Sequence, residues 1–124
     1  METFNQDEFS HENKAWAKSL EFLEQENSTL KNKLSAVVDN KDGKDFIVMA
    51  EYFQNEFILK DEVIHELKKD IVDLWEYLSK NFTNTYATNM IALRQERLRG
   101  DICSFEKDFA TLKQEFNNSI SNFL

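Results

Sequence analysis

An apolar repeat runs from Phe9 to Val37 and constrains the fold of this chain more than any other feature. Its members follow one another at alternating steps of four and three residues, which is the heptad spacing of a coiled-coil helix. Apolar or asparagine side chains fill both core positions, with Phe9, Trp16, Leu23, Leu30 and Val37 at d and Asn13, Leu20, Asn27 and Leu34 at a. About four such heptads predict a helix that packs along another helix, and they fit neither a strand nor a membrane span.

The near absence of chain-breaking residues extends this prediction to the whole sequence. Proline is missing from the 124 residues, and Gly43 and Gly100 are the two glycines. Sheet proteins need turn residues about every eight to twelve positions, whereas long helices need few. We therefore predict one all-α domain that covers residues 1–124.

Two polar stretches divide the chain into three predicted helices. The sequence DNKDGK at 39–44 separates a helix at about 9–38 from one at about 45–80. A stretch rich in Asn and Thr at 81–89 precedes a last helix at about 88–122. Helices joined this closely lie antiparallel, so the expected fold is an elongated bundle of coiled-coil-like helices about 45–55 Å long.

Two details of these helices are open to a structural check. The apolar repeat of the last helix passes through Gly100 without a slip, which favours one continuous helix. The alternative is a break after Arg99, with Asp101 capping a fourth helix. Asp7 or Ser10 is expected to cap the first helix. Asp45 is expected to cap the second.

The charge of the chain argues against nucleic-acid binding. The net charge is −8, and acidic and basic residues alternate along the helices as they do on solvated surfaces. The phosphate backbone of a nucleic acid binds surfaces rich in lysine and arginine. The one basic cluster in this sequence is Arg94, Arg97 and Arg99. A solvated helix face explains these three arginines better than a phosphate site does.

Cysteine usage and hydropathy indicate a reducing compartment. Cys103 is the one cysteine, so an intramolecular disulfide is excluded. The sequence shows neither a signal peptide nor an apolar run of about eighteen residues. We therefore expect a cytoplasmic protein that makes no contact with a membrane.

A repeated Glu-x-x-His spacing is the strongest hint of metal chemistry. It occurs as Glu8 to His11 and as Glu62 to His65, and di-iron helical bundles place two ligands in this way. In the heptad register, however, Glu62 and His65 occupy the outer positions f and b. The two motifs would also lie about 12 Å apart along the bundle. We therefore expect solvated surface residues, with no metal and no other cofactor.

No arrangement of residues predicts an enzyme. Cys103 has no histidine near it in the sequence, and a reactive thiolate needs a base or a positive neighbourhood. The eleven phenylalanines fall mostly on core positions, where they fill space between long helices. The expected function is therefore non-enzymatic: a helical coiled-coil protein that mediates self-association or protein–protein interaction. The alternative is a small helical bundle that binds an apolar ligand or a metal.

The asparagines of the first helix suggest where association takes place. In a parallel homodimer, an asparagine at position a pairs with its own copy, whereas burial against apolar residues costs about 1–3 kcal/mol. The alternative is that these asparagines reach water at the edge of a monomeric bundle. The second helix adds apolar residues outside its core stripe, which points to a homo-oligomer or a helical partner. The predicted interface comprises Asn13, Trp16, Leu20, Leu23, Asn27, Leu30, Leu34, Tyr52, Ile58 and Leu59.

Overall fold

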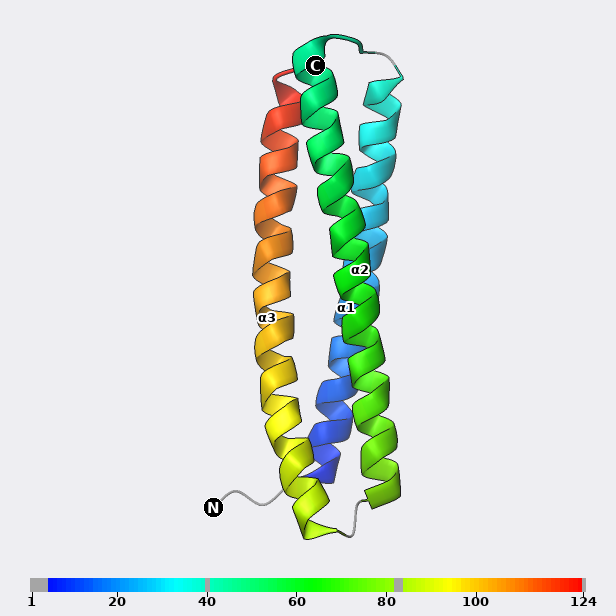
Figure 1. Ribbon diagram of the computed structural model, residues 1–124, viewed down its shortest axis with the longest axis vertical. Coiled ribbons are helices and arrows are strands. Elements are labelled where there is room, and N and C mark those ends of the chain that lie inside the picture. Colours follow the sequence, from blue (N-terminus) through cyan, green and yellow to red (C-terminus); the bar gives the residue numbers. More distant parts are fainter. Residues whose placement is uncertain (1–4, 40, 82–83, 124) are drawn as a thin grey trace.

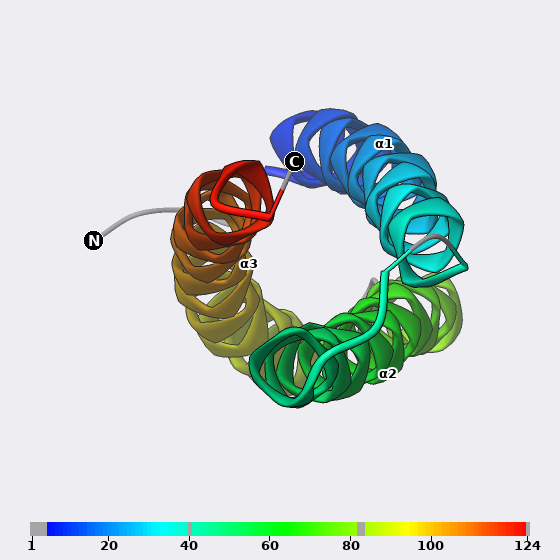
Figure 2. The same ribbon diagram turned by 90° about the horizontal axis from the view of Figure 1, so that it is seen from above.

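The computed structural model describes residues 5–39, 41–81 and 84–123, and these form an elongated bundle of three helices (Figure 1). The helices are α1 (Gln6–Val38), α2 (Lys44–Asn81) and α3 (Thr85–Ser121). Viewed along its length, the bundle is a triangle in which α2 runs antiparallel to the other two helices (Figure 2). The predicted all-α antiparallel fold is confirmed. No helix in the described part of the chain is long and apolar enough to cross a membrane.

Helix α1 begins three residues before its predicted start and α2 one residue before, and the caps of both differ from the prediction. Asn5 caps α1, because its side-chain oxygen accepts the backbone N–H groups of Asp7 and Glu8 at 3.0 and 3.1 Å. The expected cap at Asp7 or Ser10 is therefore wrong. Asp45 lies inside the first turn of α2 and does not precede it, so that expected cap is also wrong. Gly43 stands before α2 with a φ of 126°, which favours glycine.

The second joint is much shorter than the Asn- and Thr-rich stretch that predicts it. Asn84 caps α3 by accepting the backbone N–H of Ala87 at 3.0 Å. Helix α3 therefore begins at Thr85, and the following Thr and Asn residues belong to its first turns. Two residues of the predicted joint, 82 and 83, lie outside the described residues.

Helix α3 is continuous through Gly100, so the alternative of four helices is wrong. A Cβ atom added at Gly100 would meet nothing within 4 Å, since this residue lies on the outside of the bundle. An exposed glycine costs a helix up to about 1 kcal/mol relative to alanine. The continuous packing of the α3 core on both sides of Gly100 outweighs that cost.

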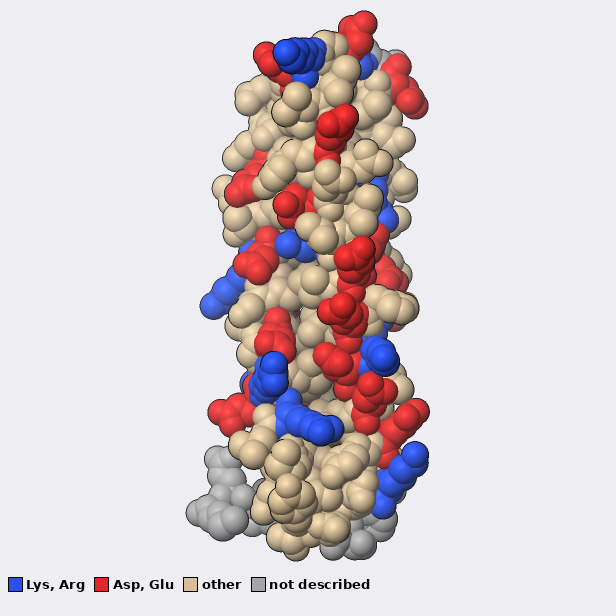
Figure 3. Space-filling model, in the orientation of Figure 1, with Lys and Arg blue, Asp and Glu red and all other residues tan. Residues whose placement is uncertain are grey.

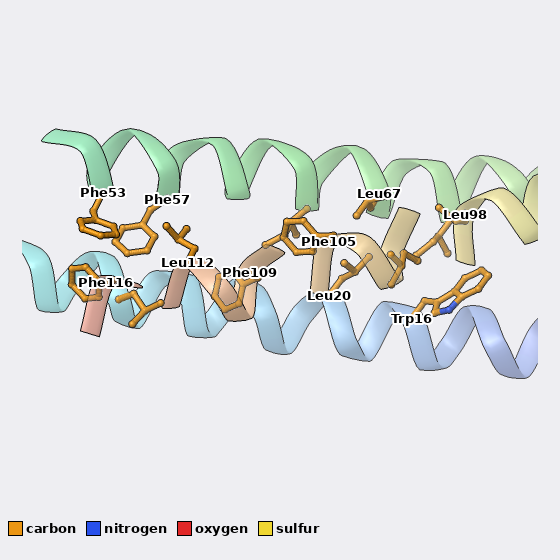
Figure 4. Packing of buried hydrophobic residues seen from close by; sticks show 14 of the residues in the cluster. Trp16, Leu20, Phe53, Phe57, Leu67, Leu98, Phe105, Phe109, Leu112 and Phe116 are labelled. Carbon is orange, nitrogen blue, oxygen red and sulfur yellow. The ribbon is translucent and has the colours of Figure 1, made fainter. Parts of the chain in front are cut away.

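The core follows the heptad positions of all three helices, except that Ala87 and Ile120 of α3 are buried outside positions a and d and that Lys60 of α2 is a partly buried residue at d. Phenylalanines dominate its upper half in Figure 1, where Phe116 of α3 packs edge-to-face against Phe53 and Phe57 of α2 (Figure 4). The ring centroids lie 5.2 and 5.1 Å apart, a separation at which aromatic pairs attract beyond simple burial. At the other end, Phe9 of α1 stacks on Trp75 of α2. These bulky rings hold the long helices together along their whole length.

Candidate protein interaction surface

The predicted interface residues of the first helix lie inside the bundle. All are buried except Leu23, which is partly buried against the core: Asn13, Trp16, Leu20, Asn27, Leu30 and Leu34. Figure 4 shows Trp16 and Leu20 pointing into the space between the helices. In this fold, α2 and α3 of the same chain therefore occupy the coiled-coil stripe of α1. A second copy gains access to that stripe only if the bundle opens.

Asn27 finds its hydrogen-bond partners within the chain. Its side chain is fully buried, and Nδ2 donates to the Phe57 carbonyl at 2.9 Å and to Asp61 Oδ1 at 2.8 Å. Asp61 also forms an ion pair with Lys31 of α1. Asp61 was not among the predicted site residues, although it occupies position e of its heptad, which flanks a helix contact. Asn27 thus joins α1 to α2 and does not reach water.

Asn13 is buried without such partners. Its side chain is 5% exposed, and neither Nδ2 nor Oδ1 forms a hydrogen bond within the described residues. The Oδ1 atom of Asn27 is likewise unsatisfied there. An unpaired buried amide costs free energy, so Asn13 weakens the bundle that contains it.

The predicted interface residues of the second helix lie on its outer face. Heptad positions b, c, f and g of α2 point away from the core or flank it, and five exposed apolar residues occupy them between Val48 and Val63. Their side chains are 37–61% exposed. We name this set the α2 outer strip: Val48, Tyr52, Ile58, Leu59 and Val63. Tyr52, Ile58 and Leu59 were predicted from the sequence as interface residues, and they are the ones that remain accessible.

Carboxylates flank the α2 outer strip on both sides. Acidic side chains form a broken column on the face that α2 presents in Figure 3. On α2, Glu56, Glu62 and Glu66 alternate with the apolar residues, and Glu56 is the most buried of these three. On α3, Asp108 and Glu115 occupy position g, which faces α2. We name these five carboxylates the acid rim.

The ion pairs of the bundle all include α1. Within the described residues they are Lys31–Asp61 and Lys68–Glu24 toward α2, and Arg99–Glu12 and Lys113–Glu26 toward α3. None joins α2 to α3, and no member of the acid rim takes part in one. The α2–α3 seam is therefore held mainly by apolar contacts, and the carboxylates of the acid rim lie along its outer edge without an ion pair among the described residues.

The three arginines do not form one cluster. Arg94 lies over the Tyr77 ring at 5.3 Å from its centroid and shares a groove of about 320 Å³ with Arg97 and three aspartates of α2 and α3. Arg99 points the other way, and its Nε and Nη2 atoms donate to Glu12 of α1 at 2.7 and 2.8 Å. Each arginine thus has acidic or aromatic neighbours within the bundle.

The histidines and the cysteine are exposed and lie apart. His11 and His65 are on the surface, and His11 lines an open groove of about 1120 Å³ between α1 and α3. Within the described residues, no group of three or more His, Cys, Asp or Glu side chains is placed to hold a metal ion. Cys103 is exposed as well.

The Glu12–Arg99 pair gives a pH-dependent contribution that can be measured. The Arg99 hydrogen bonds hold the pKa of Glu12 below its ordinary 4.5 although partial burial opposes them, and the Gln95 amide adds to the lowering. Because the folded state favours the ionised carboxyl, the pair stabilises the protein above pH 4.5 and loses this effect as the pH falls through the lowered pKa. Arg99 is half exposed, so we expect Glu12→Gln to cost less than about 1 kcal/mol at pH 7.

Urea unfolding of both proteins at pH 7 and at about pH 3 measures this contribution. The difference between wild type and Glu12→Gln should be smaller at the lower pH, because protonation of Glu12 weakens its contact with Arg99. An equal difference at both values would show that the carboxylate charge contributes nothing.

The α2 outer strip with its acid rim is therefore the candidate interaction surface, and other exposed apolar residues, among them Ile47, Val72 and Leu93, lie outside it. Comparison with protein families, with characterised proteins and with solved structures finds no match to this chain.

Proposed function

We propose that this protein is a non-enzymatic interaction module that holds another helix against the α2 outer strip. The observation that carries the proposal is the alignment of five exposed apolar side chains on one outer helix face. Single exposed apolar residues are common on soluble proteins, whereas a continuous strip of them marks a contact with another molecule. The helices of the chain itself leave this strip uncovered.

The spacing of the strip suits a helical occupant. Val48, Tyr52, Leu59 and Val63 follow at steps of four, seven and four residues, so they form a ridge along α2. The ridge is about 22 Å long, which corresponds to about four turns of a partner helix. Two occupants have this form: a second copy of the chain and a helix of another protein. In a second copy paired antiparallel about the midpoint between Asn55 and Glu56, Tyr52 of each chain would lie against Leu59 of the other.

Selection from a displayed library of helical peptides tests the proposal without assuming the occupant. The library carries random surface residues with no bias in charge, and wild-type protein is the target. Most independent binders should lose affinity for the variant Tyr52→Ser/Leu59→Ser by about tenfold or more, since apolar anchors dominate helix docking.

The matched control is Phe22→Ser/Leu93→Ser, which removes two exposed apolar side chains from other faces of the bundle. It should leave peptide binding unchanged. Binders that respond to the control variant and ignore the strip variant would refute the assignment of this surface.

A further inference from the structure

We infer that the occupant of the α2 outer strip is a basic amphipathic helix, laid over the α2–α3 seam as a fourth helix of the bundle. This inference rests on the proposed function and specifies the chemistry of the partner. It is carried by the acid rim, which borders the apolar strip and takes part in no ion pair within the described residues.

The three helix–helix contacts of the bundle, α1–α2, α1–α3 and α2–α3, differ in how their flanking charges are paired. This difference indicates the charge of the partner. Each of the four ion pairs joins α1 to a neighbour, so the flanking charges of α1 are matched by its own bundle. The α2–α3 seam places acids on both flanks, with Glu56 of α2 in register with Glu115 of α3. Like charges on facing flanks repel. A helix with lysine or arginine at its own flanking positions would place cations beside the carboxylates of α2 and beside those of α3.

The outer positions of α2 contain almost no cation that would compete with such a partner. From residue 48 to residue 76, positions b, c, f and g of α2 hold seven acids and one lysine, Lys69. Arg94 and Arg97 lie farther along the seam, beside Asp70, Asp73 and Asp101. Next to the apolar strip itself, the five carboxylates of the acid rim outnumber two lysines, the partly buried Lys60 at position d of α2 and the exposed Lys107 at position f of α3.

The shape of the seam admits a close helix. Ser104 and Thr111 occupy position c of α3, on the side that faces the strip, and both are exposed. Short side chains there let a helix backbone approach α3 while its apolar face contacts Tyr52, Leu59 and Val63 of α2. The partner helix would thus contact the apolar ridge of α2 on one side and the short polar side chains of α3 on the other, with the acid rim at the edges of the contact.

A second copy fits these charges less well. Each chain carries a net charge of −8, so pairing two copies brings acidic surfaces together. Charge therefore favours a basic helix over a second copy, although both would cover the same apolar strip.

Two synthetic peptides test the inference against the intact protein. Both are helices of about three heptads with leucine and isoleucine at a and d, and they differ in carrying lysine or glutamate at e and g. Fluorescence anisotropy at about 0.15 M salt measures their affinities. The lysine peptide should bind in a one-to-one complex at least about tenfold more tightly than the glutamate peptide, and added salt should weaken its binding.

Two charge variants separate a built site from general attraction between opposite charges. Glu56→Gln/Glu62→Gln/Glu66→Gln removes half-buried and exposed carboxylates beside the strip, and Glu21→Gln/Glu96→Gln/Glu106→Gln removes the same charge from other faces. The first variant should weaken binding of the lysine peptide by about tenfold, whereas the second should change it by less than about twofold.

The failures of this test are distinct. Equal losses in the two charge variants would overturn the inference by showing diffuse attraction. Tighter binding of the glutamate peptide, or a wild-type homodimer that light scattering shows to break in Tyr52→Ser/Leu59→Ser, would also overturn it while the proposed helix-docking function stands. If the protein bound neither peptide and showed no association that depends on the strip, both the inference and the proposed helix-docking function would be refuted.

Discussion

Replacing Asn27 with aspartate should lower the free energy of unfolding by about 3 kcal/mol or more at pH 7. The change preserves size and shape, so its cost is electrostatic. The Asn27 side chain is fully buried, and its Nδ2 atom faces two acceptors, the Phe57 carbonyl and the Asp61 carboxylate. A carboxylate in that place has no hydrogen to donate and lies against a like charge.

The pH dependence of the Asn27→Asp variant provides an internal check. Burial and the nearby Asp61 raise the pKa of the new carboxyl in the folded state above its value in the unfolded chain. The cost relative to wild type should therefore be smallest below about pH 4 and should grow as the pH rises toward 7. Urea unfolding at several pH values measures both.

Asn27→Leu is the matched control for this variant. It removes the same two hydrogen bonds without adding charge, and the Phe57 carbonyl retains its partner within the helix. Its effect should be small, within about 1 kcal/mol, because an apolar side chain also removes the unsatisfied Oδ1 atom. A loss as large as that of Asn27→Asp would show that hydrogen bonding, and not charge, dominates at this position.

Asn13→Leu should act in the opposite direction and raise the free energy of unfolding by about 1–2 kcal/mol. Asn13 is 5% exposed, and its amide atoms form no hydrogen bond within the described residues. Leucine is close to asparagine in size and turns an unpaired polar group into apolar contact at a core heptad position. Thermal and urea unfolding measure the gain.

Asn32→Leu controls for the better helix propensity of leucine, since Asn32 is exposed on the same helix. That variant should gain only a few tenths of a kcal/mol. If Asn13→Leu gains no more than its control, the Asn13 amide costs the folded protein nothing.

The heptad pattern predicts the architecture well because burial and periodicity are properties of each helix alone. The core positions of α2, from Phe46 to Leu78, are those that the spacing indicates. The partner of a core stripe is a different matter. The stripe of α1 has the same form whether α2 and α3 cover it or a second copy does, so the sequence pointed to a second copy for Asn27 where the fold supplies Phe57 and Asp61.

Polar contacts between helices were the hardest to predict, because they depend on how far one helix is displaced along the axis of its neighbour. Asp61 meets both Asn27 and Lys31 only after the joint near Gly43 has set how far α2 slides along α1. The caps at Asn5 and Asn84 involve local competition among several asparagines and threonines, which composition alone does not resolve. The exposure of Tyr52, Ile58 and Leu59 could be predicted because these apolar residues lie outside the heptad core positions of their own helix.

The odd number of helices has a mechanical consequence. Three helices joined by short connections leave residue 5 and residue 123 at opposite ends of the bundle (Figure 1). Tension applied between these ends pulls the helices past one another along their common axis. An even number of helices would place both ends together and let the same tension peel one helix away at a time. Under shear, the buried contacts along a seam resist simultaneously, so this bundle is expected to bear load between its two ends better than a two- or four-helix bundle of similar size.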